Sequence, residues 1–456
     1  FHTGIHPAKS GVARLRLDLI CSNDRNFYDY RMSSNDQTRR SFIKSTALAG
    51  VTISGPNLLL GQAKGANSRL RVGVMGLSRG KGHIKAFLDV PNCEIAYLCD
   101  VDRDRLASGD NTMSGKQEVE PKKVSDFRRI LDDPNIDALS IAAPSFWHTP
   151  AAVMACRAGK HVFVEKPGSH DAYEAKRIVE VAEETGMQVQ MGTQRRSYSG
   201  MIEGIQKIRE GVIGKPLYAR CWYYNQRPSI GKGKITDPPP ELDWMMWQGP
   251  VPEQAYKDNL VHYNWHWHWM YGGGELANNG VHSMDLARWA LGVDLPKRVT
   301  CSGGRYHHDD DQETPDTTYA VYDFGDVGLS FDGSSCHRRK PEDGRFVTVY
   351  GEGGKVDFST AAYTVYDLDG KELEKNVDPP SDVPHFTNFA SAIRDGEVLN
   401  QPIKSGQRSA LLCHYGNMAF RTNGSVDVDP ETGDLVDHPE AMKLWGRPRY
   451  REGWEF

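Results

Sequence analysis

The sequence predicts an α/β domain with a doubly wound parallel sheet, followed by an α+β domain whose sheet is mostly antiparallel. From position 70 to position 191, short apolar runs alternate with helical stretches, a pattern typical of a parallel sheet with helices on both faces. After Gly192, aromatic and β-branched alternation dominates, and this pattern favours antiparallel strands. A chain of 456 residues, 39% of them hydrophobic, is long enough for two such domains.

Five strands are expected in the first domain. Their apolar runs lie at positions 70–75, 94–99, 138–142, 161–164 and 187–191. The clearest intervening helix covers 171–185. In an open sheet of this kind, sites lie at the carboxyl ends of the strands.

The second domain is expected to combine five strands with four helices. The strands are predicted at 217–225, 298–302, 317–324, 327–332 and 345–350, and the helices at 198–210, 280–291, 386–394 and 405–421. A segment rich in glycine and proline at 232–240 and an acidic segment at 308–316 predict surface loops. The polar tail at 423–456 predicts an irregular arm.

Residues 1–67 are predicted to lie outside the fold, which leaves 68–193 for the first domain and 194–456 for the second. Arg39 and Arg40 stand in the run Thr-Arg-Arg-Ser-Phe-Ile-Lys, before a mildly apolar stretch at 45–60. This arrangement resembles a twin-arginine export signal. It predicts export by the twin-arginine route to the periplasm or another extracytoplasmic location. Residues 1–31 show no clear period.

Composition excludes several classes of protein. A formal net charge of -5 gives no reason to expect a nucleic-acid partner. Eight scattered cysteines without a Cys-x-x-Cys pair favour neither a zinc ribbon nor a dense disulfide framework, and no metal site is predicted. No apolar run approaches the length that spans a membrane.

A glycine-rich turn follows the first predicted strand. Gly76, Ser78, Arg79 and Gly80 lie where a helix is expected to begin, and small residues there let backbone amides approach a pyrophosphate. Ser78 occupies the second glycine position of the Gly-x-Gly-x-x-Gly pattern, so a plain strand-to-helix turn is the alternative. The turn is a candidate for cofactor binding.

Two other strand ends support a cofactor site. Asp100 ends the second strand, 24 residues beyond Gly76, where an acid receives the adenosine ribose hydroxyls and repels a 2′-phosphate. NAD is therefore favoured over NADP. Pro144 and His148 follow the predicted strand at 138–142, near the expected ribose and nicotinamide; His148 can equally be a helix-start residue.

Lys166 is placed at the carboxyl end of the strand at 161–164, within Glu165-Lys166-Pro167. A partly buried lysine there can carry protons or hydrogen-bond a substrate hydroxyl. The alternative for this tripeptide alone is a solvated loop lysine.

Together these features resemble the Gfo/Idh/MocA family of oxidoreductases. The runs that carry the resemblance are 158–167, 191–196 and 272–285, within a region spanning roughly 69–425. The resemblance implies a Rossmann domain that binds NAD(P), an open-faced antiparallel sheet domain, hydride exchange with sugars or cyclitols, and a homo-oligomer such as a dimer or tetramer. It also implies that Glu165 and Lys166 adjoin the cofactor and that Lys166 is catalytic.

The same family carries a later Asp-x-x-x-His pair that supplies a general base, and here this pair is Asn278 and His282. Residues four apart share a helical face, so both side chains can belong to one site. His282 is the expected base, because imidazole titrates near neutrality; a structural histidine is the alternative. Asn278 cannot act as a carboxylate and can only orient the ring or bind substrate. Asp285 can hold His282 or contact substrate.

Two further groups are candidates for substrate contact. The run Trp-His-Trp-His-Trp at 265–269, if it is a strand, places three indoles on one face as a platform for a sugar ring, with Trp267 at its centre. Core packing and a metal site are its alternatives. Arg195 can contact substrate or remain solvated.

The predicted activity is hydride transfer between a sugar or cyclitol hydroxyl and a tightly bound NAD. An exported enzyme meets no free nicotinamide pool, so its cofactor is expected to be reduced and reoxidised within one cycle. A redox-neutral NAD-dependent glycosidase, lyase or epimerase is the alternative, and a cofactor-holding binding protein is a third hypothesis.

Overall fold

The computed structural model describes residues 69–337 and 345–456. The predicted leader at 1–67 and its twin-arginine motif lie outside the described residues. Within the described part, no helix combines the length and apolar character needed to cross a membrane.

The first sheet has six parallel strands in the order β3-β2-β1-β4-β5-β6. The strands are β1 Leu70–Met75, β2 Cys93–Cys99, β3 Lys122–Val124, β4 Ala138–Ile141, β5 His161–Glu165 and β6 Val189–Gly192. Five of these strands were predicted and are confirmed. The sequence did not predict β3, because a three-residue edge strand of sequence Lys-Lys-Val carries no apolar run.

Helices cover both faces of this sheet. They are α1 Gly80–Leu88, α2 Arg103–Met113, α3 Arg128–Leu131, α4 His148–Arg157 and α5 Ala172–Thr185. Alternation along β5 shows the two layers: Val162 and Val164 join one apolar cluster, whereas Phe163 joins another, since successive strand side chains point to opposite faces. Asp171 begins α5 by accepting a hydrogen bond from the Glu174 amide.

The second sheet has ten strands in the order β14-β13-β12-β11-β7-β10-β9-β8-β15-β16. They are β7 Pro216–Tyr224, β8 Arg298–Gly304, β9 Thr317–Asp323, β10 Gly328–Ser334, β11 Val347–Gly351, β12 Gly354–Phe358, β13 Ala362–Asp367, β14 Glu372–Val377, β15 Ser425–Val428 and β16 Leu435–Val436. Only the β7–β10 pair is parallel. The mostly antiparallel sheet is therefore confirmed.

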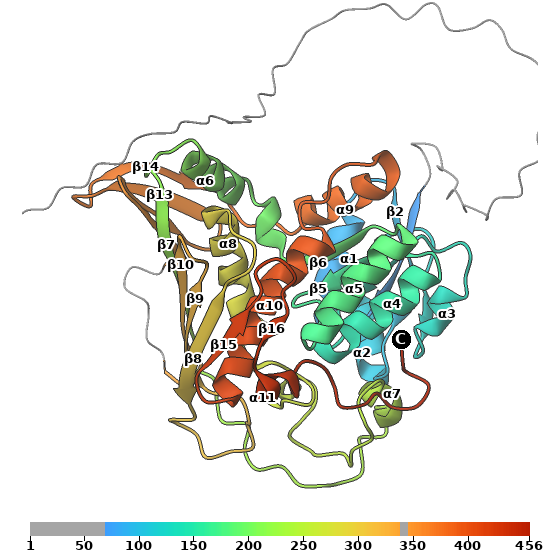
Figure 1. Ribbon diagram of the computed structural model, residues 1–456. Coiled ribbons are helices and arrows are strands. Elements are labelled where there is room, and N and C mark those ends of the chain that lie inside the picture. Colours follow the sequence, from blue (N-terminus) through green and yellow to red (C-terminus); the bar gives the residue numbers. More distant parts are fainter. Residues whose placement is uncertain (1–68, 338–344) are drawn as a thin grey trace, which may run out of the picture. The chain divides into compact units, whose positions relative to one another are not determined.

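One face of the second sheet is covered by helices and the other is open (Figure 1). The long helices of this half are α6 Ser199–Arg209, α8 Val281–Leu291, α9 Val383–Asp395 and α10 Ile403–Arg421, and the short ones are α7 Trp244–Gln248 and α11 Pro439–Met442. In β9 buried and exposed residues alternate, and Tyr319 and Val321 are 48% and 55% exposed. The open face thus presents apolar side chains to solvent.

The two sheet domains share core residues. Phe386 of α9 stacks on Phe163 of β5, with ring centroids 4.2 Å apart, and Leu411 of α10 belongs to the same cluster as Ala175 of α5. The second half of the chain therefore packs against the first sheet.

The structure corrects the tail prediction. Residues 423–456 contribute β15, β16 and α11, and Trp454 packs against Trp147 with ring centroids 4.9 Å apart. Strands of two and four residues are too short for a sequence pattern to reveal. The strands β12, β13 and β14, of five, six and six residues, were also missed.

The strand prediction for 265–269 is wrong. Asn264–Trp267 form a short 3₁₀ helix, η3, and Trp265 and Trp267 are buried while Trp269 lies beneath Arg421. The three indoles therefore share no face. Period-two alternation over five residues does not specify a strand without a partner to pair with.

Candidate active site

A cavity of about 350 Å³ lies at the carboxyl ends of β1, β2, β4 and β5, and residues of the second domain close it. The predicted site residues that line it are Gly76, Ser78, Arg79, Asp100, Pro144, His148, Glu165, Lys166, Asn278 and His282. Four predicted residues do not line it: Gly80, Arg195, Trp267 and Asp285.

Gly76 makes the turn after β1 possible. Its φ is +86°, and a Cβ atom there would lie 2.5 Å from the backbone nitrogen of Ala143. Only glycine fits such a conformation and approach. Gly80 begins α1, whose first turn has neither an acidic residue nor a side-chain cap. The helix amides at this end are therefore open to an anion.

Asp100 stands directly after β2 and faces this turn. Its carboxylate accepts hydrogen bonds from the amides of Leu77 at 2.7 Å and Asp102 at 3.0 Å, and burial raises its pKa to about 6. Ser78 accepts a hydrogen bond from Arg105 at 3.2 Å. The acid predicted to receive a ribose thus adjoins the glycine turn.

Glu165 is the centre of a buried ion-pair network. Its carboxylate accepts from Arg79 Nε at 2.7 Å and lies 3.0 Å from His83 Nε2, while Arg79 also pairs with Asp382 at 3.0 Å. Burial tends to raise the Glu165 pKa, but Arg79 and His83 outweigh it and hold that pKa well below its usual range. Glu165 therefore stays ionised and positions Arg79. His83 was not among the predicted site residues.

Lys166 and Asn278 are brought together from opposite domains. The Lys166 ammonium donates to the Asn278 carbonyl oxygen at 2.6 Å and approaches its side-chain oxygen at 3.2 Å. Burial lowers the pKa of Lys166, although the Glu165 carboxylate opposes this shift. Asn278 lies in a π-helical turn, Leu276–Gly280, that leads into α8. Such turns are frequent at functional sites.

His282 lies in the same cavity at the start of α8. Its Nδ1 is buried and has no hydrogen-bond partner among the described residues. Burial, with the nearby charges of Arg195 and Lys166, holds the pKa of His282 well below its usual value. The imidazole is thus neutral at pH 7, with a ring nitrogen that no protein group occupies.

His148 has a structural part in the cavity wall. The Gly168 amide donates to its Nδ1 at 3.2 Å, so its Nε2–H donates to the Ala143 carbonyl at 2.9 Å. Burial lowers its pKa to about 4. Both ring nitrogens are therefore used, and the ring is neutral.

Arg195 and Asp285 lie apart from the cavity lining. The Arg195 guanidinium stacks over the Phe346 ring at 4.3 Å. The Asp285 carboxylate accepts a hydrogen bond from Arg196 at 2.8 Å in a buried ion pair. It also accepts one from the Ser409 hydroxyl at 2.7 Å. The structure thus assigns Asp285 to the core, where it holds Arg196 instead of His282.

Trp267 is also displaced from its predicted role. It is 2% exposed, and the Arg227 guanidinium lies 4.7 Å from its ring. Arg227 in turn pairs with the buried carboxylate of Glu275. Trp267, Arg227 and Glu275 therefore lie outside the cavity lining.

Three aromatic residues form one wall of the cavity: Tyr263, Trp265 and His266. Trp265 and His266 belong to the run that was predicted as a candidate for substrate contact, whereas Tyr263 was not singled out. The Tyr263 hydroxyl accepts from Arg227 at 3.0 Å and from the Asn278 amide at 3.4 Å. His266 stacks on Trp265 with ring centroids 3.6 Å apart and donates to the Tyr263 carbonyl at 2.6 Å. The aromatic run signalled this wall, but its 3₁₀ turn decided which rings face the cavity.

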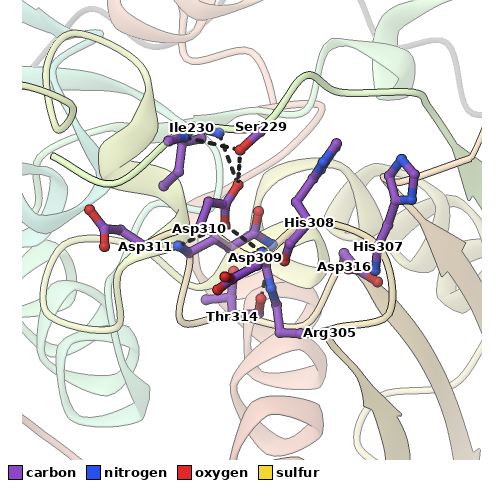
Figure 2. A network of polar contacts seen from close by, with 12 residues as sticks. Ser229, Ile230, Arg305, His307, His308, Asp309, Asp310, Asp311, Thr314 and Asp316 are labelled. Atoms are coloured by element: carbon purple, nitrogen blue, oxygen red, sulfur yellow. Dashed lines mark hydrogen bonds and ion pairs between the residues drawn. The ribbon is translucent and has the colours of Figure 1, made fainter.

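The acidic loop at 308–316 is hydrogen-bonded to the segment at 229–230 (Figure 2). Asp310 accepts from the Ser229 hydroxyl at 2.8 Å and the Ile230 amide at 2.9 Å, and His308 donates to the Arg227 carbonyl at 3.1 Å. The loop therefore fixes the segment that carries Arg227. Through Arg227 it supports Tyr263.

These features fit a dinucleotide. The strand order, the glycine turn after β1 and the acid after β2 define a dinucleotide-binding domain. Among the described residues, no group of three or more His, Cys, Asp or Glu side chains could hold a metal ion.

Comparison with known proteins agrees with a dinucleotide-binding domain. Residues 70–193 match the family described as an oxidoreductase family with an NAD-binding Rossmann fold, and residues 201–456 match its C-terminal alpha/beta domain. The chain belongs to this Gfo/Idh/MocA oxidoreductase family.

The similarity to individual relatives is low in sequence identity. The chain is 26% identical over 329 residues to a glycosyl hydrolase family 109 protein of Parabacteroides distasonis, covering 65% of this chain and 68% of that protein. It is 28% identical over 229 residues to scyllo-inositol 2-dehydrogenase (NAD(+)) of Bacillus subtilis, covering 50% and 55%. The chain spans about half the length of several other curated relatives that it matches.

Among solved structures, levoglucosan dehydrogenase in complex with NADH and levoglucosan has a TM-score of 0.63 at 18% identity. The match covers 79% of this chain and 99% of that one. This likeness concerns the fold.

Proposed function

We propose that the protein transfers hydride between a hydroxyl-bearing carbon of a sugar or cyclitol and a tightly held NAD. The observation that carries the proposal is the meeting of Lys166, Asn278 and His282 in one cavity with Gly76 and Asp100. When bound, NAD supplies the hydride acceptor for oxidation of an alcohol.

The residues that would hold the cofactor have separate tasks. The amides at the start of α1 suit a pyrophosphate, because they are donors at a helix N-terminus. Asp100 suits the ribose hydroxyls and disfavours a 2′-phosphate.

Lys166 and His282 are the candidates for moving the hydroxyl proton. A lysine whose pKa is lowered by burial can donate to or accept from a substrate hydroxyl. His282 remains neutral, and its unpartnered Nδ1 is a second possible acceptor. Asn278 orients Lys166 without adding a negative charge that would raise its pKa.

The aromatic wall supports a sugar or cyclitol as the substrate class. Tyr263 and Trp265 line the same cavity as Lys166, and aromatic side chains combine an apolar face with a polar edge. The likeness to an inositol dehydrogenase agrees with this substrate class.

Export and cofactor retention form the second part of the proposal. Arg39 and Arg40 support twin-arginine export, and an exported enzyme would keep its cofactor through a full cycle of reduction and reoxidation. A redox-neutral reaction, such as glycoside cleavage, is the alternative that the glycosyl hydrolase family 109 relative favours.

The test begins with protein purified without added cofactor. Denaturing it should release about one NAD(H) per chain, and mixing the native protein with sugars and cyclitols should change the near-ultraviolet absorbance of NADH. A product without net NADH would favour the redox-neutral reaction or a two-substrate cycle. Cofactor-free protein that works only with added NAD would contradict tight retention.

We further propose a homo-oligomer, a dimer or tetramer, formed through the open face of the second sheet. Tyr218, Tyr319 and Val321 are between 44% and 55% exposed on β7 and β9, and exposed apolar residues gathered on one face of a sheet often mark interfaces. Val321→Glu should lower the mass measured by light scattering, whereas Val398→Glu in an exposed loop should not. An unchanged mass in the first variant would contradict this interface.

A further inference from the structure

A second cavity, of about 530 Å³, lies among the start of α5, the segment after η3, one face of α10 and the residues after α11. Its size is within the range of about 300 to 1,000 Å³ that is common for small-molecule sites. It shares no lining residue with the candidate active site. The proposed hydride transfer therefore makes no use of it.

Basic side chains predominate in the walls of this second cavity. The basic residues are Arg421, Lys443, Arg447 and Arg449, and the acidic residues are Asp171 and Glu313. Glu313 is already engaged, because its carboxylate accepts from the Trp269 amide at 2.8 Å and lies 3.4 Å from His268. The excess of positive charge favours an anionic ligand.

Arg447 is the most informative of these residues. Its side chain is 5% exposed, its Nη1 donates to the Met270 carbonyl at 3.0 Å, and its Nε lies 3.4 Å from a Glu174 carboxylate oxygen. Its Nη2 is buried and has no hydrogen-bond partner within the described ranges. A buried charged donor without a partner destabilises the fold, because it has lost its hydrogen bonds to water without gaining others. A ligand oxygen would satisfy it.

Arg421 provides a second guanidinium on another element. It lies over the Trp269 ring at 4.8 Å, and it forms no ion pair with an acid in the part of the chain that the structure describes. Arg421 follows His414, Asn417 and Met418 on α10 at spacings that share one helical face. This face of α10 lines the cavity.

The two nearby acids oppose an anion less than two fully ionised carboxylates would. Glu174 is fully buried beside Asp171, and burial raises the pKa of both carboxyls. Asp171 is also occupied as the cap of α5. Raised pKa values favour protonation, which reduces the negative charge near Arg447.

We propose that this second cavity binds a small molecule bearing a carboxylate, phosphate or sulfate group, with Arg447 and Arg421 as the groups that hold the oxyanion. Guanidinium groups match these oxyanions through forked hydrogen bonds. The buried free Nη2 of Arg447 supplies one such donor, and the stacked Arg421 supplies others.

Isothermal titration calorimetry on the full chain tests this site. The protein is first saturated with NAD, so that the added anion cannot enter the pyrophosphate site, and is then titrated with inorganic phosphate, glucuronate or neutral glucose. We expect one saturable site per chain for phosphate or glucuronate, weakened by salt, and no binding of glucose. Binding of glucuronate alone would identify a sugar acid, and binding of phosphate a free or esterified phosphate.

Two variants tie the heat signal to this cavity. Arg421→Gln should weaken binding at least about tenfold, equivalent to about 1.4 kcal/mol, whereas Arg157→Gln, on the exposed end of α4, should not. Arg447→Lys keeps a positive charge near Glu174 but loses the forked donor, so it tests the site even if Arg421→Gln does not fold. Absence of saturable binding at millimolar anion would overturn the proposal. So would an anion affinity in both cavity variants equal to that of the parent protein. Because heat is measured instead of turnover, failure here leaves the proposed hydride transfer untouched.

Discussion

The Lys166 ammonium nitrogen lies 2.6 Å from the backbone carbonyl oxygen of Asn278 and 3.2 Å from its side-chain oxygen. These contacts hold a lysine from the end of β5 against a π-helical turn of the second domain. Both acceptors are neutral, so they orient the ammonium without balancing its charge by a carboxylate. A buried lysine in this setting has a lowered pKa.

Lys166→Met should abolish most turnover while NAD stays bound. Positioned acid–base groups contribute roughly 10²–10⁴-fold to rate, so we expect a fall of at least about a hundredfold. Initial rates measure turnover, and a fluorescence titration measures NAD affinity. Lys85→Met, on the exposed side of α1, is the matched control. Full activity in Lys166→Met would exclude the proposed role.

Asn278→Asp should shift the pH dependence of kcat/KM to higher pH. A carboxylate beside Nζ favours the ammonium, so the pKa of Lys166 rises by about 1–3 units and its neutral form is reached only at higher pH. Gln206→Glu, which adds the same charge on the exposed face of α6, should leave the profile in place. If both profiles coincide with that of the parent protein, Lys166 does not act in its neutral form.

Gly76→Ala should weaken NAD binding and lower stability. The added Cβ would meet the Ala143 backbone nitrogen at 2.5 Å, and we expect at least about a tenfold loss of affinity. Gly186→Ala is a matched control, because Gly186 has a φ of +68° and nothing within 4 Å of an added Cβ. It should cost about 1 kcal/mol of stability through backbone strain alone and retain NAD. Equal NAD affinity in the two variants would contradict the proposal that the turn at Gly76 binds the cofactor.

Asp100→Asn should relax the preference for NAD over NADP. Removing the carboxylate removes a repulsion of the 2′-phosphate, and such like-charge contacts cost several kcal/mol. The ratio of dissociation constants for the two cofactors should fall at least about tenfold. Asp110→Asn removes the same charge from the surface of α2 and should not change the ratio. An unaltered ratio in Asp100→Asn would place the 2′-hydroxyl elsewhere.

Asp285→Asn should lower stability, in keeping with a structural ion pair. Burial tends to raise the Asp285 pKa, but Arg196 outweighs it and holds that pKa at about 2. The folded-state pKa lies below the unfolded value of about 3.9, so the carboxylate stabilises the fold above that pH by about 2–3 kcal/mol.

The Asp285 stabilisation is lost as pH falls through about 2. Urea unfolding at several pH values should therefore show parent and Asp285→Asn converging in acid. Asp369→Asn, in an exposed turn, should match the parent throughout. A constant difference between parent and Asp285→Asn at every pH would mean that the ionised carboxylate does not provide the stabilisation.

Local sequence pattern was sufficient to predict most of the strands. It was also sufficient to predict the part of the candidate site that the first domain contributes. The glycine turn, Asp100 and Lys166 all follow apolar runs, and the carboxyl ends of parallel strands necessarily share one edge of a sheet. Positions along the chain therefore translated directly into positions in space. Short polar strands such as β3 and β14 were missed, because pairing with neighbours, and not apolar content, makes them strands.

The second half of the site depended on long-range packing. Asp285 is three residues from His282, yet Arg196 holds it in the core; Trp267 is buried beneath Arg227, while Tyr263 and Trp265 line the cavity. No periodicity encodes these outcomes, since each depends on which distant partner neutralises a charge or covers a ring. The sequence placed Lys166 at a strand end, but only the folded chain brought Asn278 to within hydrogen-bonding distance of it.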